Sequence, residues 1–239
     1  MFAPPLGLLR LLVKLFPLRA HRLFSELSID ELRVRYRKWD YFGVVAFFVL
    51  APLLTYGLHE LFIEWSQSLA PRAGDSVYTL LPNSNFWYAP ATVLGVIISC
   101  FMIYFMYGVL LRSRGQEYRY YANLSTGMNA RAMYLTFGLL LGGGFFAIAY
   151  FAAHSNLRLT EDEIVFRRIW SLEDEHYPYS RIRRLREVHH SEEDQVDFMI
   201  ELDDAERWST KVEVVFPGPR EKEFLSQRAG KPIERLVAR

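Results

Sequence analysis

Residues 41–63 read YFGVVAFFVLAPLLTYGLHELFI, and two further apolar runs with almost no charge follow at 91–111 and 132–153. An α-helix needs about 20 residues to cross the ~30 Å hydrocarbon core of a bilayer. Each run is therefore long enough to span a membrane. The sequence predicts a transmembrane domain over residues 41–153 that contains three helical spans.

The composition of the whole chain hides this organisation. Charged residues make up 23% of the chain and the mean hydropathy is +0.03, values that resemble those of a soluble protein. The charge is unevenly divided, with a net of +5 over residues 1–153 and −4 over residues 154–239. Cys100, the only cysteine, lies inside the second run, which excludes an internal disulfide framework and a thiolate metal site.

Residues 1–40 are basic and are expected to form cytoplasmic helices. The stretch 6–18, LGLLRLLVKLFPL, carries Arg10 and Lys14 inside its apolar part, which differs from the charge order of a signal peptide. It predicts either an amphipathic helix on the membrane surface or a short helix packed on the bundle. Ser28 and Glu31 have the spacing of a capping box, so a helix should begin there and continue into the first span.

The basic residues beside the spans predict the orientation. Residues 1–40 contain eight Lys and Arg, the segment 64–90 contains one, and the segment 112–131 contains four. Positively charged flanks stay on the cytoplasmic side. The protein should therefore be a multi-pass protein of the cell (inner) membrane with a cytoplasmic N-terminus, and its C-terminal domain should lie on the extracytoplasmic side.

Small residues within the spans indicate close helix packing. Gly138 and Gly142 form a GxxxG pattern, and Ala91, Gly95 and Ser99 form a small-residue stripe on the second span. Dimerisation through these faces is an alternative. A second alternative is a break at the glycines 142–144, which would make the third run a re-entrant hairpin and return the C-terminal domain to the cytoplasm.

Ionisable residues inside the spans are few. His59 and Glu60 lie within a turn of the outer end of the first run, where we expect them at the membrane edge with their polar groups toward water. Proton and ion paths are marked by ionisable residues deep in the membrane. A channel or transporter is therefore disfavoured.

The sequence pattern of residues 154–239 is typical of a β domain. Apolar residues alternate or cluster as in short strands, and turn-forming residues separate them. The residues concerned are Leu157, Leu159, Ile164, Val165, Phe166, Phe198, Ile200, Leu202, Val212 and Val214. A helix over 220–229, ended by Gly230, should follow. The sequence predicts an α+β protein in which the span bundle precedes a small antiparallel β barrel or sandwich with a C-terminal helix.

One part of this domain resembles a known family. Residues 163–170 read EIVFRRIW and residues 176–183 read HYPYSRIR, in which Tyr177, Pro178, Tyr179, Ser180 and Ile182 match a recurring element. Over residues 154–230 the chain resembles the PH-like domains that bacterial proteins carry on membrane helices. The resemblance implies a PH-like fold, and it implies binding or assembly rather than catalysis.

A basic cluster in this domain is the candidate binding site. Arg181, Arg183, Arg184 and Arg186 could hold lipid headgroups or an acidic partner. The alternative is a solvated surface in which neighbouring carboxylates pair with these arginines. His189 and His190 precede acidic residues, but adjacent residues of a strand face opposite sides, so we expect an exposed hairpin tip and no metal.

The sequence contains none of the common catalytic or nucleotide-binding motifs. We therefore expect a non-catalytic protein without cofactors, which uses its PH-like domain for protein–protein assembly or for the regulation of a membrane component. The expected partners are membrane lipids and either a protein or a second copy of the chain, and not nucleic acid. The alternative is a lipid-handling or transport component with a groove between the spans, and a cavity between the spans that reaches His59 and Glu60 would favour it.

Overall fold

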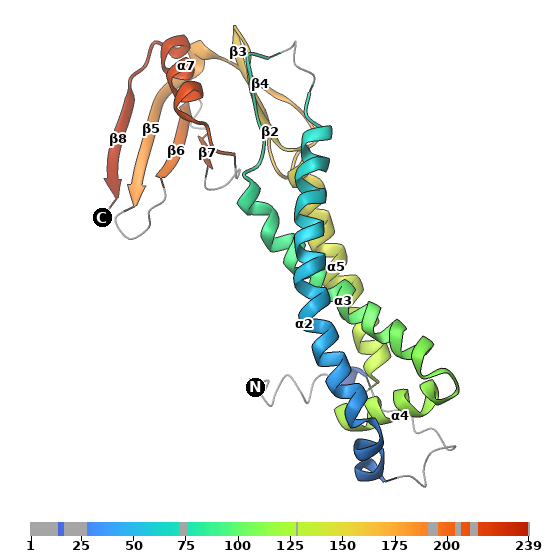
Figure 1. Ribbon diagram of the computed structural model, residues 1–239. Helices are drawn as coiled ribbons and strands as arrows, with labels where there is room; N and C mark the ends of the chain where they lie inside the picture. The colour runs from blue at the N-terminus through green and yellow to red at the C-terminus, as the bar shows by residue number, and fades with distance from the viewer. Residues whose placement is uncertain are drawn as a thin grey trace. The chain divides into compact units, whose positions relative to one another are not determined.

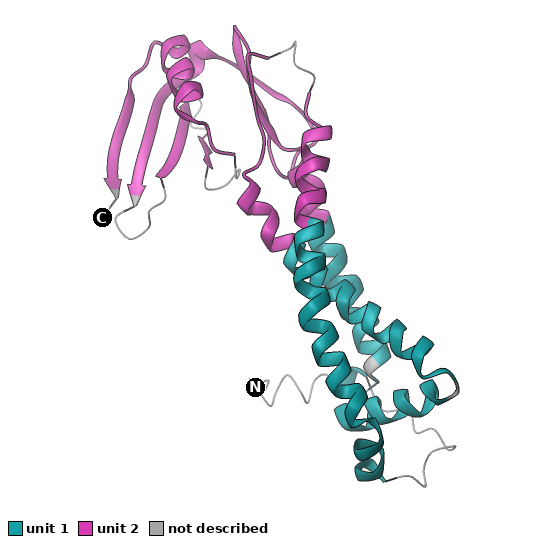
Figure 2. Cartoon of the chain, viewed as in Figure 1, with its two compact units in different colours: residues 1–58, 91–146 teal, residues 59–90, 147–239 magenta. Residues whose placement is uncertain are grey.

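The computed structural model describes residues 14–16, 28–71, 76–127, 129–190, 196–203, 207–210 and 215–238 (Figure 1). The chain divides into two compact units, shown in Figure 2. Residues 1–58 and 91–146 form a helical unit, and residues 59–90 and 147–239 form a unit that contains the sheets. The α+β class is confirmed.

Three helices are long and apolar enough to cross a membrane: α2 (Ile29–Ser68), α3 (Tyr88–Leu110) and α5 (Ala130–His154). They coincide with the three apolar runs, so the prediction of three long apolar helices is confirmed. Large apolar side chains stay exposed on all three helices, and Phe48, Phe105 and Leu139 are each more than 70% exposed. Contiguous apolar surface of this kind is unfavourable in water, whereas lipid tails would cover it.

The capping box forms as expected at the start of α2. The Glu31 backbone N–H donates to Ser28 Oγ at 3.2 Å, and the Ser28 N–H donates to Glu31 Oε2 at 3.1 Å. From this cap α2 continues without interruption through the first apolar run. The helix before the membrane and the first span are therefore one element.

Only residues 14–16 of the stretch 6–18 lie among the described residues. The carbonyl oxygen of Phe16 accepts a hydrogen bond from the N–H of Asn129 at 2.9 Å. The rings of Phe16 and Phe137 are 6.2 Å apart. These contacts favour the alternative in which this stretch packs on the chain's own helices.

The glycines at 142–144 do not interrupt α5, which is a continuous helix of 25 residues. The segment before α5, which the sequence indicated only as a basic connection, forms a helix of its own, α4 (Gly115–Thr126). Gly127 ends α4 in the left-handed conformation, with a φ of 71° that glycine adopts at little cost. The continuous α5 favours a full span over a re-entrant hairpin.

The first sheet contains strands from two distant parts of the chain. Its order is β1 (Tyr78–Leu80), β2 (Asn156–Leu159), β3 (Glu163–Arg167) and β4 (Glu175–Pro178), with antiparallel neighbours throughout. β1 lies between α2 and α3, whereas β2 follows α5 directly. The connection after the first span is therefore part of the β domain, which the sequence did not indicate.

The second sheet has the order β7 (Arg207–Ser209), β6 (Val196–Leu202), β5 (Ile182–His190) and β8 (Ile233–Ala238). The expected C-terminal helix is α7 (Pro219–Ala229), ended by Gly230 at a φ of 61°. After α7 the chain adds β8 parallel to β5, whereas β5, β6 and β7 are antiparallel. The final strand was not predicted, because a short segment after the helix has no partner that local sequence could reveal.

Among the described strands no ladder joins the two sheets, so they do not close into a barrel. The short 3-10 helix η4 (Tyr179–Arg181) separates β4 from β5. Both sheets nevertheless share one hydrophobic core, in which the rings of Phe166 and Trp208 stack at 5.7 Å and Leu225 of α7 is fully buried. We call this two-sheet structure, together with α7, the β module.

Candidate functional site

The structure divides the four candidate arginines into two pairs. Arg181 Nε donates to Asp203 Oδ1 at 2.9 Å, and its guanidinium lies over the Tyr177 ring at 5.2 Å. Arg186 pairs with Glu201 at 2.7 Å and with Glu234 at 3.2 Å. These two side chains are therefore held by the β module itself, as the alternative of an ion-paired surface supposed.

Arg183 and Arg184 are different, because both are exposed and neither forms a salt bridge with the residues that the structure describes. Adjacent strand residues normally face opposite sides. Here the register between β5 and β6 shifts between Ile182 and Arg184, so the regular alternation is interrupted at Arg183. The irregularity leaves both guanidinium groups in solvent at the start of β5.

Several other charges of the β module are paired. Glu187 on β5 accepts a hydrogen bond from Lys222 of α7 at 2.6 Å and lies 3.3 Å from Arg235 of β8. The bond from Lys222 is the main reason that the pKa of the Glu187 carboxyl lies below its usual value. This carboxylate links β5 and β8 of the second sheet to α7 and is structural.

A second paired network holds the first sheet. Asp174 is bound by Arg158 and by Arg167, whose Nε donates to Asp174 Oδ1 at 2.7 Å. Burial by itself would raise the pKa of Asp174, but the two guanidinium groups outweigh it and hold that pKa below its usual value. Among the four candidate arginines, Arg183 and Arg184 are the two that are exposed and form no salt bridge with the described residues.

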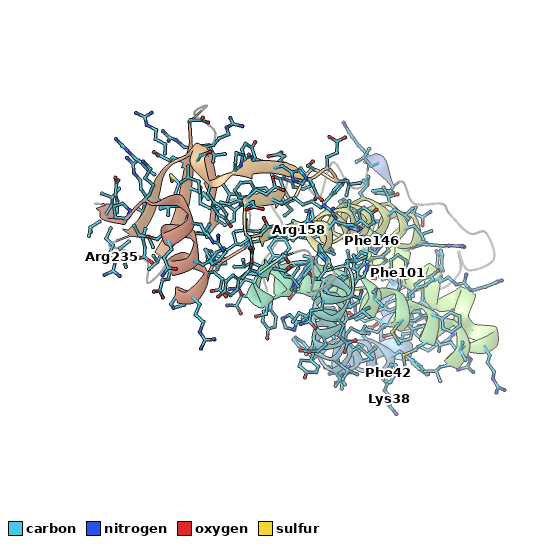
Figure 3. All side chains as sticks on the ribbon, turned by 90° about the horizontal axis from the view of Figure 1, so that it is seen from above. Lys38, Phe42, Phe101, Phe146, Arg158 and Arg235 are labelled. Carbon is cyan, nitrogen blue, oxygen red and sulfur yellow. The ribbon has the colours of Figure 1, made fainter. Side chains whose placement is uncertain are left out.

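The edge of the second sheet offers a further contact surface. β8 pairs with β5 on one side, and no described strand pairs with its other side. Leu236 and Val237 on β8 are 43% and 72% exposed, and the neighbouring Arg235, labelled in Figure 3, is also exposed. An exposed edge strand with apolar side chains is a template for the addition of a further strand.

The histidine stretch shows no metal site in the part that is described. His189 is exposed and lies 3.9 Å from Glu187, while the acidic residues at 192–194 lie outside the described residues. Among the described residues no group of three His, Cys, Asp or Glu side chains could hold a metal ion.

The small residues of the spans lie where helices approach closely in the helical unit. A Cβ atom at Gly95 would be 2.8 Å from the backbone nitrogen of Thr55, so α2 and α3 are in backbone contact there. At Gly138 it would be 2.6 Å from the Phe101 ring, and at Gly142 it would be in ordinary contact with Leu94. Ala91 and Ser99 are fully buried.

His59 differs from the expectation of a side chain that reaches toward water. It is only 5% exposed and its ring stacks on that of Tyr88 at 3.9 Å. Its Nε2 lies 3.1 Å from the carbonyl oxygen of Ser84, and its Nδ1 lies 3.2 Å from Glu60. His59 therefore joins the end of α2 to the segment before α3, while Glu60 is half exposed.

A cavity with a volume of about 710 Å³ lies in the helical unit, where α2, α3, α4 and α5 meet. Volumes of this size are typical of small-molecule sites. Neither His59 nor Glu60 lines it. We call it the α4 cavity.

Tyrosines and one carboxylate form the polar wall of the α4 cavity. Tyr121 donates to Asp40 at 2.7 Å and Tyr118 lies 3.5 Å from the same carboxylate. Tyr107 donates to the carbonyl oxygen of Trp39 at 2.7 Å. Burial, together with the bond to Asp40, raises the pKa of Tyr121 to about 12, so its hydroxyl stays protonated and donates.

Sequence reasoning missed the α4 cavity. The tyrosines at 118, 120 and 121 and the basic Arg119 were visible as a cluster, but residues 112–131 were read only as a basic connection. The sequence signal for this cavity was a cluster of tyrosines in a segment between two spans, together with the acidic Asp40 at the start of the first span.

Comparison with known proteins adds no relative to this description: no family model, no curated protein and no solved structure matches the chain.

Proposed function

We propose that this protein is a non-catalytic, multi-pass membrane protein that presents its β module to another membrane component and assembles with it or regulates it. The observation that carries the proposal is the pair Arg183 and Arg184, two adjacent arginines at the register irregularity of β5 that are both exposed and form no salt bridge with the described residues. Unpaired guanidinium groups bind carboxylates strongly and with defined geometry. The partner would be a protein with an acidic segment.

The resemblance of residues 154–230 to bacterial PH-like domains supports a binding role, since such domains serve recognition and assembly. The shared core of the two sheets supports it as well, because a module with its own core presents its surface in one geometry. The β8 edge supplies a second contact, by which a strand of the partner or of a second copy would extend the sheet.

The proposed arrangement in the membrane follows from the charges and from the sheet. The basic end of the bundle, with residues 33–38 and α4, faces the cytoplasm of a bacterial cell. The β module lies on the opposite, extracytoplasmic side of the inner membrane. The partner would therefore be an envelope protein or the exposed part of another inner-membrane protein.

The test is the recovery of partners by the full-length chain from native membranes, quantified by mass spectrometry. Arg183→Ala with Arg184→Ala should remove a membrane protein that the unchanged chain recovers. The matched control is Arg220→Ala with Lys231→Ala, which removes two exposed cations elsewhere on the β module. Equal recovery by both double variants would contradict the proposal.

One observation favours the second candidate, a lipid-handling component with a groove between the spans. The α4 cavity lies between the helices, is large, and has both polar and apolar walls. A transfer assay between vesicles tests this candidate, and lipid transfer that requires the protein would support it. The α4 cavity can bind a ligand whether or not the protein transfers lipid between membranes.

A further inference from the structure

The α4 cavity has its polar and apolar residues at opposite ends. Asp40, Gly43, Val44, Phe47 and Phe48 follow one another at helical spacing along one face of α2, which spans about 12 Å at 1.5 Å per residue. Asp40 lies beside the tyrosines of α4, and Phe48 lies deeper in the first apolar run. The cavity is therefore shaped and lined for an amphiphile.

The polar end carries positive charge that the described residues do not neutralise. Arg119 and Arg131 both line the α4 cavity, and neither forms a salt bridge with any described residue. Asp40, which also lines the cavity, already accepts a hydrogen bond from the hydroxyl of Tyr121. Glu117 on the same helix as Arg119 is bound by Arg35. Two arginines remain available for an anion.

A smaller cavity of about 370 Å³ shares this end, and Arg119, Arg131 and Tyr104 line both. The Tyr104 hydroxyl is buried and has no hydrogen-bond partner among the described residues. A buried hydroxyl without a partner costs free energy, and a bound oxygen acceptor would satisfy it. This hydroxyl is a second, independent sign of a polar ligand group at this end.

The apolar end opens sideways, toward the surface that lipid would cover. Val44 and Phe48 line the α4 cavity and yet are 55% and 71% exposed on the bundle. An acyl chain could pass between the cavity and the bilayer without crossing a polar barrier. A soluble ligand would instead leave this apolar opening uncovered.

We propose that the α4 cavity binds one anionic phospholipid, with its phosphate between Arg119 and Arg131 and its upper acyl chains along Val44, Phe47 and Phe48. Arginine forks match phosphate oxygens and form charge-assisted hydrogen bonds to them. The site lies at the basic end of the bundle, where anionic headgroups gather beside juxtamembrane cations. The inference does not depend on the partner proposed for the β module.

Cys100 gives a probe inside the site, because it lines the apolar part of the α4 cavity and is the only cysteine of the chain. The full-length protein is reconstituted in vesicles of phosphatidylcholine alone or of phosphatidylcholine with phosphatidylglycerol. The rate of Cys100 alkylation by N-ethylmaleimide is then measured. Phosphatidylglycerol should slow the alkylation, and phosphatidylcholine alone should not.

Arg119→Gln with Arg131→Gln should weaken this protection by about tenfold or more, since two charge-assisted hydrogen bonds are lost. The matched control is Arg33→Gln with Arg37→Gln, which removes two cations from the same end of α2 outside the cavity lining and should keep the protection. Tyr104→Phe retains the ring and removes only the unpartnered hydroxyl, and it should weaken the protection by a few fold.

The protein without substitutions allows a further test of the same proposal. Native mass spectrometry should show phosphatidylglycerol retained by the purified protein, and prior alkylation of Cys100 should abolish this retention. Retention after alkylation would overturn the proposal. So would equal protection by phosphatidylcholine alone, protection by inorganic phosphate in detergent, or equal loss in the two double-arginine variants.

Discussion

Thr79 and Arg158 are directly opposite each other in the antiparallel pair of β1 and β2. Thr79 lies between α2 and α3, whereas Arg158 follows α5. If the three helices cross the membrane, these two segments can pair only when they lie on the same side. The chain must then cross the membrane an even number of times between β1 and β2, which α3 and α5 together provide. A re-entrant third run would leave a single crossing between the two strands and would place them on opposite sides.

Cysteines placed at the two opposed positions should form a disulfide. In a Cys100→Ser background, Thr79→Cys with Arg158→Cys brings two thiols to positions whose Cα atoms in antiparallel sheets are about 4.5–5.5 Å apart, within disulfide range. Mild oxidation should remove both free thiols, and a reductant should restore them. Thr79→Cys with Arg220→Cys, which are not paired, should retain its thiols. Two free thiols in the first variant would contradict the β1–β2 pairing.

An added methyl group should separate α2 from α3. Gly95→Ala places a Cβ 2.8 Å from the Thr55 nitrogen and 3.1 Å from its Cα, backbone atoms that cannot move alone. We expect a loss of about 1–3 kcal/mol of stability, measured by unfolding in detergent. Gly57→Ala on α2 meets nothing within 4 Å and should leave stability nearly unchanged. A similar effect of both substitutions would argue against this contact.

The Asp174 network should make the stability of the β module depend on pH in the acid range. The pKa of Asp174 is lower in the folded protein than in the unfolded chain, so its contribution is present above the unfolded value of about 3.9. That contribution is lost as the pH falls through the lower, folded-state pKa. Asp174→Asn should reduce the stability at pH 7 by about 1–3 kcal/mol and flatten its decline in acid. Thermal unfolding followed by circular dichroism from neutral to acid pH measures both effects, and an unchanged acid profile would count against the network.

His59 should stabilise the C-terminal part of α2 through its ring and its hydrogen bond. His59→Phe keeps an aromatic ring against Tyr88 but removes the contact with the Ser84 carbonyl oxygen at 3.1 Å. We expect a loss of about 1 kcal/mol. His59→Ala, which removes both contacts, should cost more in the same thermal unfolding assay. No difference between the two variants would show that the stacking contributes little.

Local patterns were enough to predict the elements that depend on local interactions. The three apolar runs predicted α2, α3 and α5 within a few residues, Ser28 and Glu31 predicted the start of α2, and Gly230 predicted the end of α7. In each case the deciding interactions lie within one helix or at its ends, so the sequence displays them directly.

The features that the sequence did not reveal depend on distant partners. β1 has only three residues, and only its pairing with β2 makes it a strand. β8 likewise exists through β5. At the candidate binding site, the sequence displayed four arginines but not the register irregularity and the carboxylates that leave only Arg183 and Arg184 unpaired. The α4 cavity required the fold of α4 against α2, which no periodicity shows.

The decisive measurement for the three crossings is the membrane side on which three exposed positions lie. In a Cys100→Ser background, single cysteines are placed at Asn85, before α3, at Arg220 in the β module and at Ser125 in α4, all exposed positions. An impermeant thiol reagent is applied to intact cells. The account predicts that the cysteines at 85 and 220 are both labelled, whereas the one at 125 is labelled only after the cells are broken. If positions 220 and 125 were both labelled only in broken cells while position 85 was labelled in intact cells, the result would contradict the three crossings and the pairing of β1 with β2.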